Sequence, residues 1–471
     1  MNKHTAHPHW HTGVSVLLAA TLTSACGNIT PPEYRGVDTP AKASWSRPAQ
    51  FSPAATIAPD WWRGFGDPDL NALVDSAITG SFDLKALAAR IGVAEASIDE
   101  ARAGARPSMD IAAAGTFQKV TGQPFSRQYN LGTQVNWELD VWGKVEKSAQ
   151  AQEAEFRATE ADWRAGYLTL VADVSTTYFQ ILQLDEQLAQ QRRTLDKNQQ
   201  ILATYESMLA NGLVPQTEVL RQRAEIARLT TDLVELQRAR DLAGNALATL
   251  LGKSAGTFTV PTGALQDRVR LPEVPAGLPA ELLKRRPDVV AAEYRVLEAY
   301  DLVGEARLAQ LPSIGLTAQG GTASFALTDL LKSFTLGFLP SINIPAFNPA
   351  IKARIKTTEA QIKVVEAEYQ RTVIAAFEEV ENALVNLEAH KKQREQLLQQ
   401  VEHLNVVAAQ TSAQLAEGLI SQLELFETER SLLSAQLALL ANHQQILSDT
   451  VTLYKALGGG WPVVEVRNES K

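Results

Sequence analysis

Residues 348–387 read NPAIKARIKTTEAQIKVVEAEYQRTVIAAFEEVENALVNL and open a run of 108 residues without proline, Ala350–Leu457, whose only glycine is Gly418. Asn348 and Pro349 have the residue types that favour a helix N-cap and a first helical turn. Apolar residues then recur at alternating spacings of four and three, which is typical of a coiled-coil seam. The seam residues are Val373, Phe377, Val380, Leu384 and Leu387.

This pattern predicts a helical hairpin over residues 349–457, with its turn at Glu417–Gln422. The first arm of the hairpin would be on the order of 100 Å long at ~1.5 Å per residue. An ordinary soluble domain has no need for a hairpin of this length.

The first half of the chain repeats the same pattern. Each residue of an earlier seam lies 206 residues before its counterpart, and the turn Asn211–Gln216 precedes Glu417–Gln422 by the same offset. A fixed offset over separated positions indicates internal duplication. We therefore expect a first repeat at 61–252, containing a hairpin at 143–251, and a second repeat at 281–457. The earlier seam consists of Tyr167, Val171, Val174, Tyr178 and Ile181.

Composition excludes several classes of protein. The 471 residues carry a net charge of −9 without a long basic run, so nucleic acid is not an expected partner. The single cysteine excludes an intrachain disulfide and a cysteine-based zinc cluster. Nothing in the sequence predicts a metal site, a cofactor or catalytic residues, because nucleophile elbows, phosphate loops and ligand clusters are missing from it.

The N-terminus predicts export from the cytoplasm. Residues 1–25 combine Lys3, a short apolar run and small residues, which is the pattern of a signal peptide. The sequence before Cys26 resembles a bacterial lipobox, so we expect lipidation of Cys26 and a lipidated tether over residues 26–60. The alternative is a signal peptide that is cut elsewhere, with Cys26 incidental.

Four short segments alternate between apolar and polar residues, with the period of two that predicts strands. Each has about the length that a tilted strand needs to cross a bilayer. Four strands are too few to close a barrel, so several copies of the chain would have to share one. The alternative is a soluble sheet packed on the helices. The segments lie near residues 109–119, 129–141, 312–321 and 333–345.

The whole mature chain resembles the TolC-like outer-membrane factors, and it is most similar to their lipoprotein branch, the NodT or OprM type. The sequence motifs that carry the resemblance lie at Trp62–Leu70, Ala105–Ser108, Trp137–Gly143 and Gly418–Leu425. One departure is Ile344–Pro349, where members of the family usually have a glycine pair.

The resemblance implies a homotrimer in the outer membrane, with a twelve-stranded barrel and a helical tunnel that extends into the periplasm. It implies a belt around the tunnel that includes a linker at residues 253–280 and a C-terminal tail at 458–471. It also implies contact with outer-membrane lipid and two protein partners, a periplasmic adaptor and an inner-membrane pump of the RND type.

The resemblance also assigns roles to the two turns. Adaptor contacts are expected at Gly212, Leu213, Gly418, Leu419 and Ser421. Glycine permits a left-handed backbone and the close approach of another chain. The alternative is an ordinary helix-hairpin turn, in which glycine is favoured anyway.

A pore constriction is expected at Glu424 and Glu427, where members of the family have paired aspartates. Their spacing of three places them on one helix face, and threefold symmetry would make a carboxylate ring that favours cations. The alternative is a solvated helix face. Arg430 is expected to pair with Glu427, and the tyrosine that the family usually has before this turn is replaced by Leu415.

Aromatic residues flank the predicted strand ends. Trp137, Trp142 and Phe347 suit the interface between membrane and water, where a ring has one apolar and one wet side. The alternative is packing in the core of the belt.

The leading functional hypothesis is a passive, non-enzymatic efflux channel for small molecules. A related alternative is the outer-membrane channel of type I protein secretion. An alternative from a different class is a periplasmic coiled-coil scaffold or adaptor that never inserts into a membrane.

Overall fold

The computed structural model describes residues 29–39, 44–46, 57–272, 274 and 285–460. Two compact units make up the chain. Unit 1 consists of Met1–Thr39, Ala89–Glu160 and Ala291–Arg371, and unit 2 consists of Pro40–Ala88, Ala161–Val290 and Thr372–Lys471. The expected signal peptide and Cys26 lie outside the described residues. Residues 273 and 275–280 of the expected linker and the tail after residue 460 also lie outside them.

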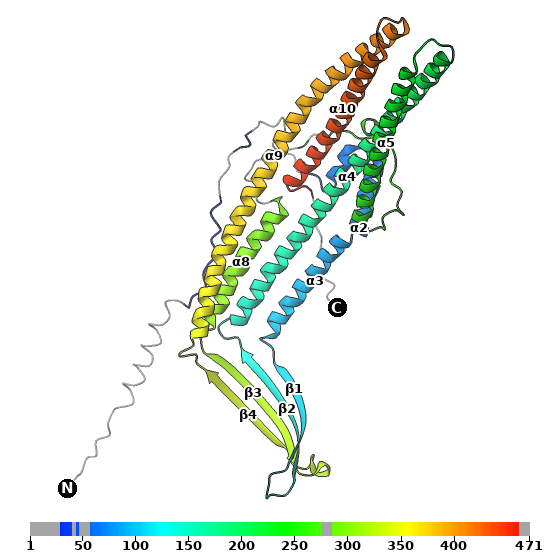
Figure 1. Cartoon of the computed structure of the whole chain (residues 1–471). Helices are drawn as coiled ribbons and strands as arrows, with labels where there is room; N and C mark the ends of the chain where they lie inside the picture. The colour runs from blue at the N-terminus through cyan, green and yellow to red at the C-terminus, as the bar shows by residue number, and fades with distance from the viewer. Residues whose placement is uncertain (1–28, 40–43, 47–56, 273, 275–284, 461–471) are drawn as a thin grey trace, which may run out of the picture. The chain divides into compact units, whose positions relative to one another are not determined.

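Four helices dominate the chain (Figure 1). Helix α4 spans Lys144–Ala210 and is followed by α5, Gln216–Leu250; helix α9 spans Pro349–Ala416 and is followed by α10, Gln422–Ala456. The two pairs match in length, with 67 and 35 residues in the first and 68 and 35 in the second. Together with four strands, these hairpins confirm the predicted fold class, mainly α with duplicated helical hairpins.

The remaining helical elements are shorter. They are η2 (Trp61–Phe65), α2 (Pro68–Gly80), α3 (Phe82–Ala103), α6 (Leu265–Arg268), α8 (Pro287–Leu308) and η3 (Leu327–Asp329). Across the described ranges, every helix is too short or too polar to cross a lipid bilayer.

Local sequence explains where helices begin. The Asn348 Oδ1 accepts a hydrogen bond from the Ala350 N–H at 3.0 Å, so Asn348 caps α9 ahead of Pro349. Helix α2 begins in the same way, because the carboxylate of Asp67 accepts the N–H groups of Asp69 and Leu70.

The core of unit 2 is built on the two predicted seams. Val171, Val174 and Ile181 are fully buried, and so are Val373 and Val380. Burial of each such side chain contributes about 1.5–3 kcal/mol.

An aromatic cluster extends this core. Trp61 and Phe65 of η2 are buried, and the Trp61 ring stacks on Tyr454 with ring centroids 4.8 Å apart. This stacking fixes the C-terminal end of α10 to the segment that opens the folded part of unit 2.

Unit 1 contains one antiparallel sheet in the order β1-β2-β3-β4. Its strands are β1 (Ser108–Gln118), β2 (Ser126–Leu139), β3 (Ser313–Ser324) and β4 (Thr335–Asn343). The sequence predicted four strands without saying which of them pair. The structure joins them, because β2 pairs with β3 from Tyr129↔Ser324 to Leu139↔Ile314. Strand β3 also extends three residues beyond its predicted end at residue 321.

The segment 29–39 forms neither helix nor strand, but it is held against α8 and α9 of unit 1. The Thr30 carbonyl accepts a hydrogen bond from Arg307 Nη1 at 2.8 Å, and the Asp38 carbonyl accepts one from Gln370 Nε2 at 2.9 Å. Between them, Tyr34 makes an edge contact with Tyr300. Residues 29–39 of the expected tether are therefore anchored at both ends and in the middle.

Candidate functional site

The sheet of unit 1 is open at both edges. Within the described residues, β1 pairs only with β2, and β4 pairs only with β3. The outer edges of both strands therefore carry backbone N–H and C=O groups without a partner strand. Such edges attract another strand, and they are not tolerated in lipid.

The strand register sorts the side chains onto two faces. Met109↔Val135, Val135↔Ala318 and Ala318↔Phe338 form one continuous row of apolar residues across all four strands. The neighbouring row, Asp110↔Gln134, Gln134↔Gln319 and Gln319↔Gly337, lies on the opposite face and is mainly polar. A one-residue slip in any pair would mix the two faces, so this register preserves one apolar and one polar surface.

The polar face is rich in side-chain amides. Gln134 Nε2 donates to Asn136 Oδ1 at 2.8 Å, and Thr317 Oγ1 donates to the same oxygen at 3.2 Å. Near the end of β2, the Glu138 carboxylate pairs with Lys144 at 2.7 Å. The apolar face remains largely uncovered in a single chain, since Ile111, Leu336 and Phe338 are exposed.

The three aromatic residues that were predicted at the membrane interface lie in unit 1. Trp137 Nε1 donates to the Ala105 carbonyl at 2.8 Å, and Trp142 Nε1 donates to the Pro312 carbonyl at 2.7 Å. Both rings are partly exposed and Phe347 is largely exposed, so none of them packs in the core of the single chain. Their role at a membrane interface stays a prediction.

The two predicted turns share one geometry. Gly212 and Gly418 have φ values of 72° and 74°. The Gly212 N–H donates to the Leu209 carbonyl and the Leu213 N–H to the Met208 carbonyl, and the equivalent pair of bonds recurs at Gly418 and Leu419. This is the Schellman arrangement that ends helices.

The turn glycines are required by backbone conformation rather than by crowding. A Cβ atom on Gly212 or Gly418 would meet no atom of this chain within 4 Å. Leu213 and Leu419 project from the two turns and are exposed. Contact with an adaptor at these turns, including Ser421, stays a prediction.

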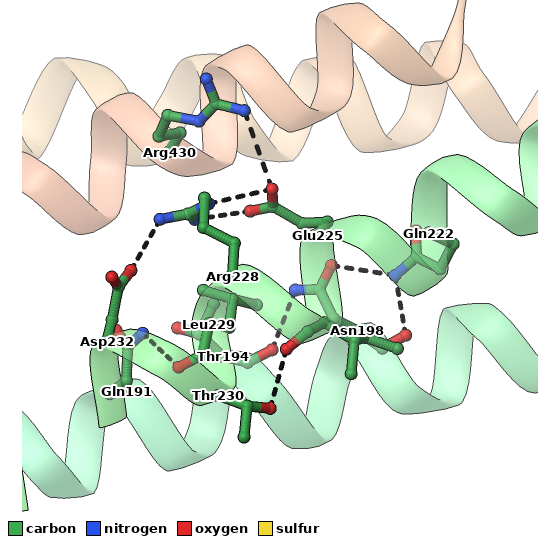
Figure 2. Close-up of polar contacts among 11 residues, drawn as sticks. Gln191, Thr194, Asn198, Gln222, Glu225, Arg228, Leu229, Thr230, Asp232 and Arg430 are labelled. Carbon is green, nitrogen blue, oxygen red and sulfur yellow. Dashed lines mark hydrogen bonds and ion pairs between the residues drawn. The ribbon is translucent and has the colours of Figure 1, made fainter. Parts of the chain in front are cut away.

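Glu424 and Glu427 lie in the first turns of α10, and both are exposed. The expected ion pair between Arg430 and Glu427 is wrong. Arg430 Nη2 instead lies 3.7 Å from Glu225 Oε2 of α5 (Figure 2). Glu225 lies on α5 facing α10 and its side chain is only 13% exposed, so water screens its charge less than that of Glu427 on the exposed surface of α10.

Glu225 is the centre of a charged cluster in unit 2 (Figure 2). Arg228 binds Glu225 at 2.6 Å and Asp232 at 2.7 Å. Hydrogen bonding from Arg228 lowers the pKa of Glu225 below its ordinary value, and the charge of Arg430 acts in the same direction. A carboxylate at position 225 therefore ties α5 to α10.

A buried row of amides runs beside this cluster. Gln422 Nε2 of α10 donates to Gln222 Oε1 of α5 at 2.9 Å, and Gln222 Nε2 donates to Asn198 Oδ1 of α4 at 3.0 Å. Asn198 Nδ2 in turn donates to the Thr194 carbonyl at 2.9 Å (Figure 2). Three helices from the two hairpins are thus joined by one chain of hydrogen bonds.

Sequence reasoning missed this row, although a signal for it exists. In the second repeat, apolar residues recur at Leu397 and Leu404, and the residues 206 positions earlier in α4 are Gln191 and Asn198. A polar residue at a seam position can fix the register of a coiled coil at some cost in stability.

Unit 1 contains a second group that sequence reasoning missed. The Glu298 carboxyl of α8 lies beside Glu155 of α4 and near Arg295. Burial raises the pKa of Glu298 to about 7, and the negative charge of Glu155 adds to the shift. Two carboxylates that share one site cannot both ionise easily.

The chain is similar to outer-membrane proteins over nearly its whole length. The family described as "Outer membrane efflux protein" matches residues 73–253 and 278–459. A Pseudomonas putida protein named "Pyoverdine export outer membrane protein OpmQ" is 30% identical, with 93% of this chain and 95% of the relative covered. The P. putida "Antibiotic efflux pump outer membrane protein ArpC" is 31% identical, with 95% of each covered.

A solved structure shares the architecture as well. The open state of the Neisseria gonorrhoeae MtrE outer membrane channel is 28% identical and matches with a TM-score of 0.80. The match covers 92% of this chain and 98% of the other.

We predict that Gln222→Leu lowers the free energy of unfolding by about 1–3 kcal/mol, because it removes the acceptor of the buried Gln422 Nε2 and the donor to the buried Asn198 Oδ1. Urea denaturation of the purified full chain in detergent, followed by far-UV circular dichroism, measures this loss. The control is Gln200→Leu, at an exposed position of α4, the helix that carries Asn198, and it is expected to change stability by less than about 0.5 kcal/mol. Equal losses in the two variants would contradict a structural role for the amide row.

We also predict that the stability of the chain depends on pH through Glu298. Its pKa is raised from 4.5 to about 7, so the stability that its proton contributes is present below pH 4.5 and is lost as the pH rises through 7. Glu298→Gln should therefore unfold at a higher urea concentration than the parent at pH 8 but not at pH 4. Glu95→Gln, at an exposed position of α3, is the control and should show the same difference from the parent at both pH values. A pH-independent effect of Glu298→Gln would rule out this explanation.

Proposed function

The chain belongs to the outer membrane efflux protein family, and we propose that it is the outer-membrane channel of a tripartite, RND-type efflux system. In this role it carries small molecules passively across the periplasm and the outer membrane, without catalysis. The names of its relatives, which refer to pyoverdine export and antibiotic efflux, support small molecules over proteins as the cargo.

One observation carries the proposal. The four-stranded sheet has an apolar face, a polar face and two unpaired edges. In a bilayer the apolar face can contact lipid, but the unpaired edges cannot remain open. Pairing β4 of one copy with β1 of the next satisfies both edges, and three copies give the twelve strands of a closed barrel whose lumen is lined by the polar face.

The hairpins supply the periplasmic part of the conduit in this proposal. The Schellman turns with exposed Leu213 and Leu419 are the proposed contacts for a periplasmic adaptor, which would connect the channel to the inner-membrane pump. Trp137 lies near the end of β2, and Trp142 and Phe347 follow β2 and β4 closely; all three are proposed to lie at the membrane interface. Lipidation of Cys26 would add an anchor in the same membrane.

Membrane fractionation with cross-linking tests the proposal. We expect the full chain in the outer-membrane fraction, and we expect cross-linking to capture it as a trimer. The physical reason is that the unpaired edges of β1 and β4 are satisfied only by neighbouring copies. Recovery of a soluble periplasmic monomer would overturn the proposal and favour a scaffold.

Selectivity for ions tests the proposed constriction. We predict that Glu424→Gln combined with Glu427→Gln lowers the preference for cations by at least about fivefold, since each unit charge ~4 Å from a passing ion contributes about 1 kcal/mol in water and the double variant removes two such charges from every copy. The reversal potential of the purified protein in planar bilayers under a potassium chloride gradient measures this preference. Glu395→Gln, at an exposed position of α9, is the control and should leave the potential unchanged. An unchanged potential in the double variant would place the constriction elsewhere.

A further inference from the structure

The connection between β3 and β4 has an unusual surface. It spans residues 325–334 and contains the short helix η3 (Figure 1). Because β3 follows α8 and β4 precedes α9, this loop lies at the end of the sheet far from those two helices. Phe325, Leu327, Leu331 and Phe334 are all exposed on it, and Leu331 is 83% exposed.

Several polar groups of the loop have partners within the loop or in β3. The Asp329 N–H donates to the Ala326 carbonyl and the Lys332 N–H donates to the Asp329 carbonyl, both at 3.1 Å. The Lys332 ammonium pairs with the Asp329 carboxylate at 2.6 Å, and the Thr322 hydroxyl donates to the Leu330 carbonyl. The loop therefore presents apolar side chains outward, while Lys332 and Asp329 neutralise each other and part of its backbone is hydrogen-bonded within the loop.

The loop also lies on a definite side of the sheet. A Cβ atom on Gly320 would come within 3.2 Å of the Phe334 ring, so this ring sits over β3. A cavity of about 220 Å³ is lined by Leu331 and Phe334 together with Ile111 and Leu131. The register places Ile111 and Leu131 on the apolar face. The exposed apolar side chains of the loop thus continue the apolar face of the sheet, where Leu336 is 82% exposed.

We propose that loop 325–334 is a lipid-contacting element, with Leu331 and Phe334 among the acyl chains of the outer leaflet. The inference rests on the proposed insertion of the sheet into a membrane. Lipid is favoured as the occupant because the loop surface is continuous with the face that would already contact lipid, and because its one lysine is neutralised by Asp329.

The β1–β2 loop provides an internal contrast. Residues 119–125 include Lys119, Thr121, Gly122 and Gln123, and the Lys119 ammonium donates to the Gln123 carbonyl at 2.9 Å. This loop is more polar, so a label at Thr121 is expected to remain in water.

Site-specific fluorescence distinguishes these environments. Leu331→Cys, Leu336→Cys and Thr121→Cys are made in the full chain, labelled with a bimane maleimide, and reconstituted into phosphatidylcholine vesicles with and without brominated acyl chains. Cys26 is the only other cysteine, so the parent chain treated in the same way reports the background labelling. Leu327→Cys is a second reporter on the loop, for use if Leu331→Cys does not assemble like the parent.

The expected result is strong quenching by brominated lipid at Leu331 and Leu336, with little quenching at Thr121. Quenching at Leu336 without quenching at Leu331 would overturn the lipid contact of the loop, whether the loop instead fills the barrel mouth or packs against a neighbouring copy, and would leave the barrel proposal intact. Absence of quenching at both positions would overturn the insertion of the sheet itself, and the inference with it.

Discussion

Unpaired backbone groups at the edge of a sheet are the constraint on which the rest of the structure depends. Water can satisfy such groups, but lipid cannot. The sheet of unit 1 has two such edges, on β1 and β4, and an apolar face that the chain itself does not cover. A single chain therefore cannot satisfy this sheet in a membrane. Assembly with further copies follows from hydrogen bonding, before any property of the helices is considered.

The two hairpins have different types of side chain at some equivalent positions of their long helices. In α9 the seam continues with leucines at 397 and 404, whereas the equivalent positions of α4 are Gln191 and Asn198. Gln191 donates to the Leu229 carbonyl of α5, and Asn198 accepts from Gln222 of α5, which in turn accepts from Gln422 of α10. The two repeats thus share the fold of the hairpin, but only the first has amides at these two positions.

Much of the fold could be predicted from the sequence, because buried apolar residues recur with the period of the helix or strand that contains them. The seam from Val373 to Leu387 and the alternation in the strands are local signals of this kind. The pairing of β2 with β3 left no such signal, since residues 140–312 separate the two strands. Arg430 was assigned to a neighbour on its own helix, but its partner Glu225 comes from another helix, and sequence spacing does not report such contacts.

The hydrogen bonds of segment 29–39 limit where Cys26, the proposed lipidation site, can lie. Thr30 is bound to Arg307 near the end of α8, and β3 begins only a few residues later. Cys26 is four residues from Thr30, so it can reach no farther than about 14 Å from that point at about 3.5 Å per residue. An acyl group on Cys26 would therefore enter the same leaflet as the near ends of the strands. The acyl group and the strands of one chain would thus be inserted in the same bilayer. The acyl group could not reach the other membrane of the cell envelope.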